Sequence, residues 1–243
     1  MRMLTFAKRN FMEIIRDPLN LSFLFGFPIV LLLLLSAIQA NIPVSLFEIA
    51  HLSPGIAVFG LAFMTLFSAT IIAKDRQSSF MHRLYTTPMT PVDFILGYTL
   101  PLIPIALAEG VATYLFAIIL GLDVTVHILL SLVLLIPVAL LYIALGLLCG
   151  SVFNDKQVGG ICGALLTNLS AWLSGIWFDL DLVGGVFKKI AYALPFVHSV
   201  EMQRAAIAGD YSGIFPHLWW VLGYALVILA AAVLLFLRQM KKQ

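Results

Sequence analysis

The sequence predicts an all-α integral membrane protein with six transmembrane helices and an amphipathic interfacial helix before them. Hydrophobic residues make up 62% of the 243 residues and charged residues only 11%, whereas ordinary soluble domains carry about 25% charge. A soluble fold of this composition would leave its exterior nearly uncharged. The apolar residues also gather in windows of about 20 residues, the length with which a helix crosses a bilayer. We therefore expect one transmembrane domain over residues 1–243.

Six windows qualify as spans, and the basic residues between them orient the chain. With these spans, eleven Lys and Arg residues fall on the side of the two termini and three on the other side. Because cytoplasmic loops carry an excess of Lys and Arg, we expect both termini in the cytoplasm. The expected spans are about 20–40, 54–74, 97–120, 128–150, 158–178 and 215–237.

Residues 2–17 are predicted to form a helix on the cytoplasmic membrane surface. One face of that helix carries Leu4, Ala7, Phe11, Ile14 and Ile15, and the opposite face carries Arg2, Arg9, Glu13 and Arg16. Such a helix lies in the interface with its basic side chains near anionic headgroups. Asp17-Pro18 then turns the chain into the first span. A simple anchor without a mechanical role is the alternative.

The longest predicted cytoplasmic loop follows the second span and suits one short docking helix over 78–90. Thr87-Pro88 ends this helix. Exposed aromatic and basic side chains on a short helix are typical of protein interfaces, and anchoring to the bilayer surface is an equal alternative. The residues that would dock are Arg76, Phe80, Met81, Arg83, Leu84 and Tyr85, with Pro88 at the end.

Residues 179–214 form a long segment on the opposite, extracellular side. Loops beyond about 15 residues usually have structure or function of their own. Phe187, Ile190, Ala191 and Leu194 have helical spacing before Pro195, and a second helical stretch extends over 197–208. We expect two short amphipathic helices that re-enter the outer leaflet.

Enzyme signatures are missing from the chain. The sequence contains no phosphate-binding Gly-x-x-x-x-Gly-Lys-Ser/Thr string and no dinucleotide, zinc-protease or serine-hydrolase motif. The five histidines lack metal-ligand spacing, and Cys149 and Cys162 lie in apolar stretches as packing residues. A net charge of +2 gives no reason to expect nucleic acid. We expect no catalytic residue, metal or cofactor on this chain.

A few side chains inside the spans are candidates for a substrate pathway. Glu109 is an acidic residue deep in a span, where a carboxylate is costly, so it is either functional or a hydrogen-bonded link between helices. The fifth span is unusually polar around Asn168 and carries Trp172. Phe59, Phe63 and Phe67 form a stripe on the second span, and such a stripe faces lipid or core more often than substrate.

Two stretches resemble the permease subunit of ABC-2 type ABC transporters. Residues 74–76, 80–88 and 94–97 are similar to that family's acidic-Arg, Leu-x-x-Thr-Pro and Leu-Gly pattern after the second span, with Asp75 where Glu is commoner. Residues 174–178, 194–195 and 201–209 resemble its Ser-Gly end of the fifth span and its outer re-entrant segment, without the usual proline near 182–185. The resemblance covers essentially the whole chain, and the order and spacing of these motifs together make it specific.

The resemblance implies a permease fold of the type V exporter kind in the bacterial inner (plasma) membrane. It implies a separate ABC ATPase subunit, two per complex, that binds ATP and Mg and docks on the coupling helix Phe80–Pro88. Phe11, Ile14 and Arg16 would belong to an elbow helix that touches the same ATPase. A second permease copy or homologue would complete the pathway, with the first and fifth spans near the seam, and membrane lipids would surround it.

Among the substrates of such exporters, the apolar spans favour a small amphipathic drug, antibiotic or lipid-like molecule over a polysaccharide. The main alternative is an ion-coupled secondary transporter that uses Glu109 as its proton site. The six spans show no evident inverted repeat, which weakens that alternative. A membrane anchor or receptor subunit without translocation is the third possibility.

Overall fold

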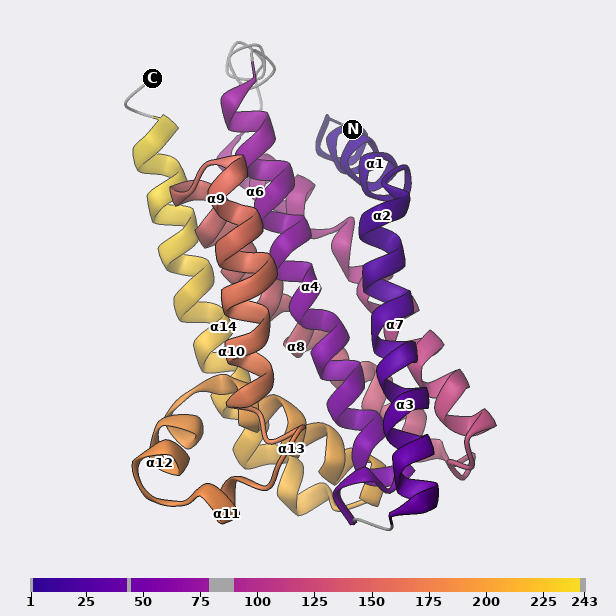
Figure 1. The fold of residues 1–243 in the computed structure, drawn as a ribbon. Helices are drawn as coiled ribbons and strands as arrows, with labels where there is room; N and C mark the ends of the chain where they lie inside the picture. The colour runs from indigo at the N-terminus through magenta and orange to yellow at the C-terminus, as the bar shows by residue number, and fades with distance from the viewer. Residues whose placement is uncertain (1, 43–44, 79–89, 241–243) are drawn as a thin grey trace.

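The structure, a computed structural model, describes residues 2–42, 45–78 and 90–240, and the regular secondary structure in those ranges is all helical (Figure 1). The long helices stand side by side as one bundle. In chain order the elements are α1 (Arg2–Ile15), α2 (Pro18–Leu21), the π-helical η1 (Ser22–Gly26), α3 (Phe27–Asn41), the 3₁₀ turn η2 (Ser45–Phe47), α4 (Ile49–Gln77), α6 (Pro91–Thr99), α7 (Leu102–Ile119), α8 (Val126–Val152), α9 (Asp155–Val158), the π-helical η3 (Gly159–Leu166), α10 (Thr167–Trp172), α11 (Leu180–Val183), α12 (Gly185–Ala193), α13 (Pro195–Ala208) and α14 (Tyr211–Met240).

Five stretches within the described residues are long and apolar enough to cross a membrane. They match five of the predicted spans and confirm an all-helical, multi-pass membrane protein. The third stretch begins earlier than predicted because Thr90 and Asp93 form a capping box that starts α6 directly after the undescribed residues 79–89. The stretches are Pro18–Asn41, Ile49–Gln77, Val92–Ile119, Val126–Val152 and Tyr211–Leu235.

The predicted span 158–178 has different ends in the structure. A capping box between Asn154 and Gln157 starts the helix at Asp155, and η3 continues it through a π-helical stretch. The helix then ends at Trp172, six residues before the predicted end. Gly175 has a φ of +72°, a conformation that glycine adopts without strain, and it lies in the turn that leads away from the helix.

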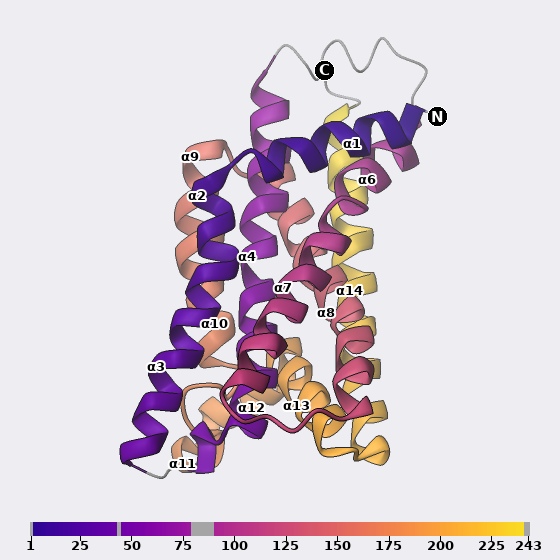
Figure 2. The ribbon, with the colours of Figure 1, turned by 90° about the vertical axis from the view of Figure 1, so that its right-hand side faces the viewer.

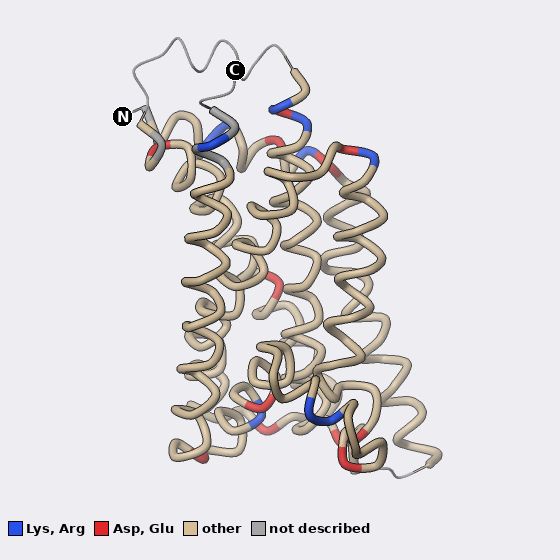
Figure 3. Tube along the Cα trace, turned by 90° about the vertical axis from the view of Figure 1, so that its left-hand side faces the viewer, with Lys and Arg blue, Asp and Glu red and all other residues tan. Residues whose placement is uncertain are grey.

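The charged residues gather at the two ends of the bundle, and the middle of the helices is nearly free of them (Figure 3). Both described termini lie at one end, which we call the termini end, and α11, α12 and α13 lie at the other, the α13 end (Figures 1 and 2). Helix α1 lies across the termini end and does not run along the bundle as the long helices do (Figure 2). That orientation is the one expected of an interfacial amphipathic helix.

Helix α4 is the centre of the bundle and packs against α3, α7, α8, η3 and α13. It approaches α8 closely because Gly146 has no side chain: a Cβ there would lie 2.5 Å from Ser68 Cβ and 2.6 Å from the Thr65 carbonyl oxygen. The hydroxyl of Thr65 donates to the Tyr142 carbonyl at 3.0 Å. Close backbone approach with side-chain hydrogen bonds is the usual way in which membrane helices associate.

The segment 179–214 contains three described helices where two were expected. Helix α13 is not a surface helix: it packs against α4, α8 and α14, and most of its residues are buried. Its polar side chains find partners inside, since the Ser131 hydroxyl donates to Gln203 Oε1 and also bonds Tyr114 Oη. This chain of hydrogen bonds joins α7, α8 and α13 inside the bundle.

Candidate coupling and pathway sites

A buried ion pair joins the N-terminal helix to the end of α4. Asp75 is 3% exposed and accepts from Arg9 Nη1 at 2.7 Å, Arg9 Nη2 at 2.9 Å and Tyr98 Oη at 2.9 Å. Burial opposes the charge of Arg9, but the hydrogen bonds to Asp75 and the carboxylate charge raise the pKa of the guanidinium. A two-pronged guanidinium–carboxylate pair fixes geometry as well as charge. We call Arg9, Asp75 and Tyr98 the α1 clasp.

Apolar packing and one further hydrogen bond hold α1 along α6. Phe6 packs edge-on against Phe94 and Tyr98, with ring centroids 5.9 and 4.9 Å away. Asn10, fully buried, donates to the Gly97 carbonyl at 2.9 Å. A Cβ on Gly97 would lie 2.3 Å from the Phe6 ring, so this close packing depends on glycine.

The α1 clasp brackets the segment predicted to be the coupling helix. Asp75 lies shortly before the undescribed residues 79–89 and pairs with Arg9 of α1, and Tyr98 lies shortly after them, donates to Asp75 and packs against Phe6 of α1. Arg76 donates to the Gly150 carbonyl at 2.6 Å and so ties the same end of α4 to α8. The other predicted docking residues, Phe80, Met81, Arg83, Leu84, Tyr85 and Pro88, lie outside the described residues.

The face of α1 that is buried differs from the predicted one. Ala7 and Ile14 are buried and Arg16 is exposed, as expected, and Phe11 is half-buried, but Leu4 and Ile15 of the predicted apolar face are 62% and 43% exposed. Phe6 and Asn10 are buried instead. Arg9, expected at the headgroups, turns toward Asp75 because a buried carboxylate needs a counter-charge. Asn10 lies in line with Phe6 at i, i+4, and that spacing was visible in the sequence.

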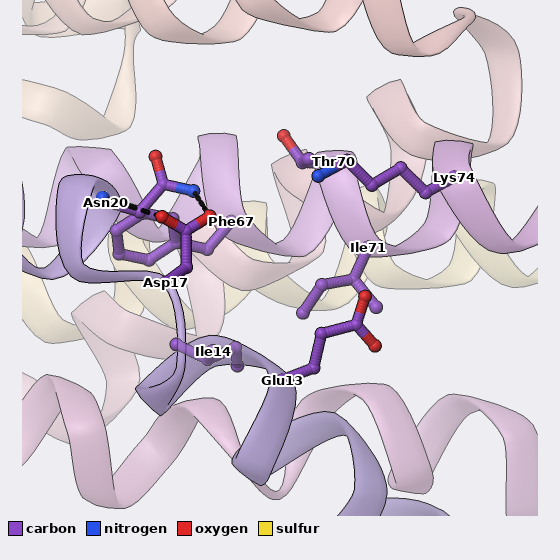
Figure 4. A pocket seen from close by; sticks show the side chains of 8 residues that line it. All are labelled: Glu13, Ile14, Asp17, Asn20, Phe67, Thr70, Ile71 and Lys74. Carbon is purple, nitrogen blue, oxygen red and sulfur yellow. Dashed lines mark hydrogen bonds between the residues drawn. The ribbon is translucent and has the colours of Figure 1, made fainter.

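A small cavity lies where α1, α2 and α4 meet (Figure 4). Asp17 caps α2 there, accepting from the Asn20 backbone at 3.1 Å and from Asn20 Nδ2 at 2.7 Å. The cavity measures about 30 Å³, room for little more than a water molecule. Its lining residues are Glu13, Ile14, Asp17, Asn20, Phe67, Thr70, Ile71 and Lys74.

The phenylalanine stripe of the second span is buried inside the chain. Phe59 and Phe63 contact each other edge-on at 5.8 Å, and both contact Phe27 of α3 at about 6 Å. Trp177 contacts Phe59 at 5.5 Å. Phe67 is also buried and lines the small cavity near the termini end. The stripe therefore fills the contact between α3 and α4, and a substrate path along it would need these helices to separate.

Glu109 lies in α7 and is fully buried against α4. Its Oε1 accepts from the Thr113 hydroxyl at 2.9 Å. A Cβ on Gly60 would lie 2.0 Å from Oε1, so the absence of that side chain makes room for the carboxyl group. Oε2 has no hydrogen-bond partner within the described structure. An uncharged carboxylic acid fits these surroundings, because an unpaired carboxylate is costly in the membrane interior.

Asn168 and Trp172 lie on an exposed face of α10, apart from the stripe. The Asn168 amide donates back to the Ala164 carbonyl at 2.8 Å. Both side chains line a shallow apolar hollow of about 520 Å³ with Gly160, Leu165, Leu169 and Phe187 among the other residues. The structure thus does not bring the six predicted pathway residues into one cavity.

The sequence reasoning missed Phe6, Asn10 and Tyr98 and assigned no contact to Asp75. The partners in the clasp are separated by 66 residues between Arg9 and Asp75 and by 23 between Asp75 and Tyr98, so no local spacing reveals them. Over the part of the chain that the structure describes, no three His, Cys, Asp or Glu side chains are placed to hold a metal ion.

Comparison with protein-family models identifies the family of this chain. The model of the ABC-2 type transporter family matches residues 1–208. No curated protein matches the chain. The family match covers most of the sequence, including α1, the clasp and the segment between α4 and α6, and it confirms the resemblance and a role as a membrane transport component. The chain belongs to the ABC-2 type transporter family.

Proposed function

We propose that this chain is the membrane-spanning subunit of an ATP-driven exporter. Two permease copies form the translocation pathway, and two separate ABC ATPase subunits supply the energy. The termini end faces the cytoplasm of a bacterial cell, and the segment Asp155–Trp172 also crosses the membrane, as the fifth of six spans along the chain. The observation that carries the proposal is the α1 clasp, which holds both flanks of the coupling segment on one helix.

The clasp supplies a route for mechanical coupling. An ATPase that grips residues 80–88 pulls on α4 and α6 together, and both are bonded to α1 by charged and apolar contacts. Arg76 carries the same displacement to α8 through the Gly150 carbonyl. A partner can drive a conformational change only if its contacts differ between the two states. A joint of this kind converts a local contact into movement of whole helices.

The apolar α3–α4 contact supports a small amphipathic drug, antibiotic or lipid-like molecule as cargo. Opening that contact exposes Phe27, Phe59 and Phe63, a surface that suits rings and acyl chains rather than hydrated sugars. A transport assay tests this directly. If polysaccharide export depends on the chain and drug or lipid export does not, the cargo assignment is wrong.

Phe80→Ala tests the coupling role. We expect the variant to insert into the membrane normally but to lose substrate-stimulated ATP hydrolysis, because the aromatic anchor of the coupling segment is removed. Phe215→Ala is the matched control, since Phe215 is an exposed aromatic of α14. Unchanged stimulated hydrolysis in the Phe80 variant would contradict the proposal.

An ion-coupled transporter is the second candidate, and the unpartnered Oε2 of Glu109 favours it. That mechanism requires transport by this chain alone, driven by a proton gradient and abolished in Glu109→Gln. The exporter proposal expects the glutamine variant to retain ATP-dependent transport, because a neutral amide replaces a neutral acid. Protonophore-sensitive transport without ATP would favour the second candidate.

A further inference from the structure

A cavity of about 700 Å³ opens at the α13 end, well within the size range of small-molecule sites. It lies between η2, the start of α4, the turn after α10, and helices α11, α12 and α13. Arg204 of α13 holds its wall together by donating to the carbonyls of His51 at 3.3 Å and Gly175 at 3.1 Å. Four aromatic side chains line the cavity: Phe47, Trp177, Phe178 and Tyr192.

Negative charge in this cavity exceeds positive charge. Of its four carboxylates, Glu201 is paired with Arg204 at 2.9 Å and Asp181 is paired with Lys188. Glu48 and Asp179 have no basic partner in the described parts of the chain. Asp179 uses one oxygen to cap α11, and its second oxygen stays available. Two carboxylates without an ion-pair contact therefore lie among aromatic rings, although the charges of Arg204 and Lys188 are near enough to interact with Asp179.

The ammonium group of Lys188 lies at the edge of this cavity and shows how a cation can be held there. The Lys188 ammonium lies 5.6 Å over the Tyr192 ring while it pairs with Asp181. An ammonium between a carboxylate and an aromatic face is the geometry by which proteins bind organic cations. Lys188 is exposed, so a ligand cation is able to compete with it.

We propose that this cavity binds an amphipathic organic cation, at the end of the bundle where the exporter releases its cargo. The inference rests on the proposed function and narrows its cargo class. Glu48 and Asp179 attract the charged group, the aromatic side chains cover the apolar part, and Arg204 positions the wall without contacting the cation. Lys188 acts as an internal competitor for Asp181 and Tyr192.

Equilibrium dialysis of tetraphenylphosphonium tests the site with the full chain in nanodiscs of zwitterionic lipid, with empty nanodiscs subtracted. Glu48→Gln combined with Asp179→Asn should weaken binding about fivefold or more at low salt, because two attractive charges are lost. Both changes keep side-chain shape, and asparagine keeps the helix cap. Asp123→Asn with Asp210→Asn is the control: it removes two carboxylates that do not line the cavity, and binding should change less than twofold.

Two further measurements distinguish a specific cation site from nonspecific binding to an apolar surface. Tetraphenylborate, the anion of the same shape, should not compete with the cation, and Lys188→Gln should tighten cation binding by removing the internal competitor. Equal binding of both ions, an unchanged Glu48/Asp179 variant, or weaker binding in Lys188→Gln would overturn the inference. The assay contains no ATPase and no nucleotide, so it tests the cation site alone. If the chain copurifies with an ATPase but does not bind the cation, this inference is wrong and the exporter proposal stands.

Discussion

Helix α4 and the segment Asp155–Trp172 are neighbours in the bundle, yet they are enclosed in opposite ways. In α4, 89% of the most apolar stretch is buried, and the chain itself surrounds it. The neighbouring segment packs on α4 with one side and exposes Leu165 and Trp172 on the other, at 62% and 59%. A face closed by its own chain belongs to the folded core, whereas an open apolar face is left for lipid or another subunit.

Two glycines repeat this contrast: Gly146 of α8, which faces the first region, α4, and Gly160 in the second region. Gly146 is pressed against α4, whereas a Cβ on Gly160 would meet nothing within 4 Å. Glycine in the first region is required by a neighbour inside the chain. In the second region it keeps a surface smooth for a partner outside, and we propose that this partner is the second permease copy.

The largest effect should come from filling the contact between α8 and α4. Gly146→Val places a side chain against the Thr65 carbonyl and Ser68, and these atoms belong to packed helices that cannot move freely. Overpacking of this kind costs about 1–3 kcal/mol or more, so the thermal midpoint of the purified permease should fall by about 5 °C or more.

Gly160→Val is the matched substitution on the open face. It should leave the thermal midpoint of the monomer nearly unchanged and instead lower the dimer fraction, measured by light scattering in detergent. If Gly160→Val destabilises the monomer as much as Gly146→Val does, the two regions do not differ in the way described.

The next effect concerns the α1 clasp at the termini end of α4. Asp75→Ala leaves Arg9 and Tyr98 without their shared acceptor, at a cost of about 1–3 kcal/mol that is reduced because Arg9 is partly solvated. We expect a smaller drop in the thermal midpoint than in Gly146→Val, together with loss of stimulated ATP hydrolysis. Glu13→Gln removes only the solvated partner of Arg9 and should change neither measurement. An Asp75→Ala variant with normal stimulation would remove the clasp from the coupling route.

The smallest effect is a pH dependence at the α13 end. Burial lowers the pKa of His198 from its ordinary value of 6.5, and nearby His217 lowers it too, while the bond to the Tyr192 carbonyl and the charge of Glu201 oppose this. The unfolded chain then binds the proton more readily than the folded one. Stability should therefore be intact above about pH 6.5 and fall as the pH drops below it.

His198→Gln should flatten this decline, a difference of a few degrees in thermal midpoint between pH 7.5 and 5.5. The Nδ1 atoms of His198 and His217 lie 2.8 Å apart, so only one of the pair carries a charge without breaking their hydrogen bond. A wild-type midpoint that rises on acidification would contradict the stated sign.

Local patterns were enough to predict five of the spans, since each is a run of apolar residues that needs no knowledge of its neighbours. The burial of helix α13 was harder to predict from the sequence. The sequence predicted an amphipathic helix that re-enters the outer leaflet, but α13 is buried in the bundle, where Gln203 Oε1 accepts from the Ser131 hydroxyl across 72 residues of chain. A buried polar residue looks like a surface residue until its distant partner is known.

The candidate site shows the same limit. The docking segment, predicted from its aromatic and basic residues, lies outside the described residues, and the ion pair beside it could not be predicted, because Arg9 meets Asp75 across 66 residues of chain. The end of the 158–178 span was placed too late because the apolar pattern continues past Trp172, while the backbone turns at Gly175.

The central claim is that this chain is a permease half that works with a second copy and with ATPase subunits. Native mass spectrometry of the tagged chain, purified from its own membrane, tests this claim most directly. We predict an assembly of two permease chains and two subunits that carry the phosphate-binding loop. A stable, transport-competent preparation that contains this chain and no such ATPase would contradict the account.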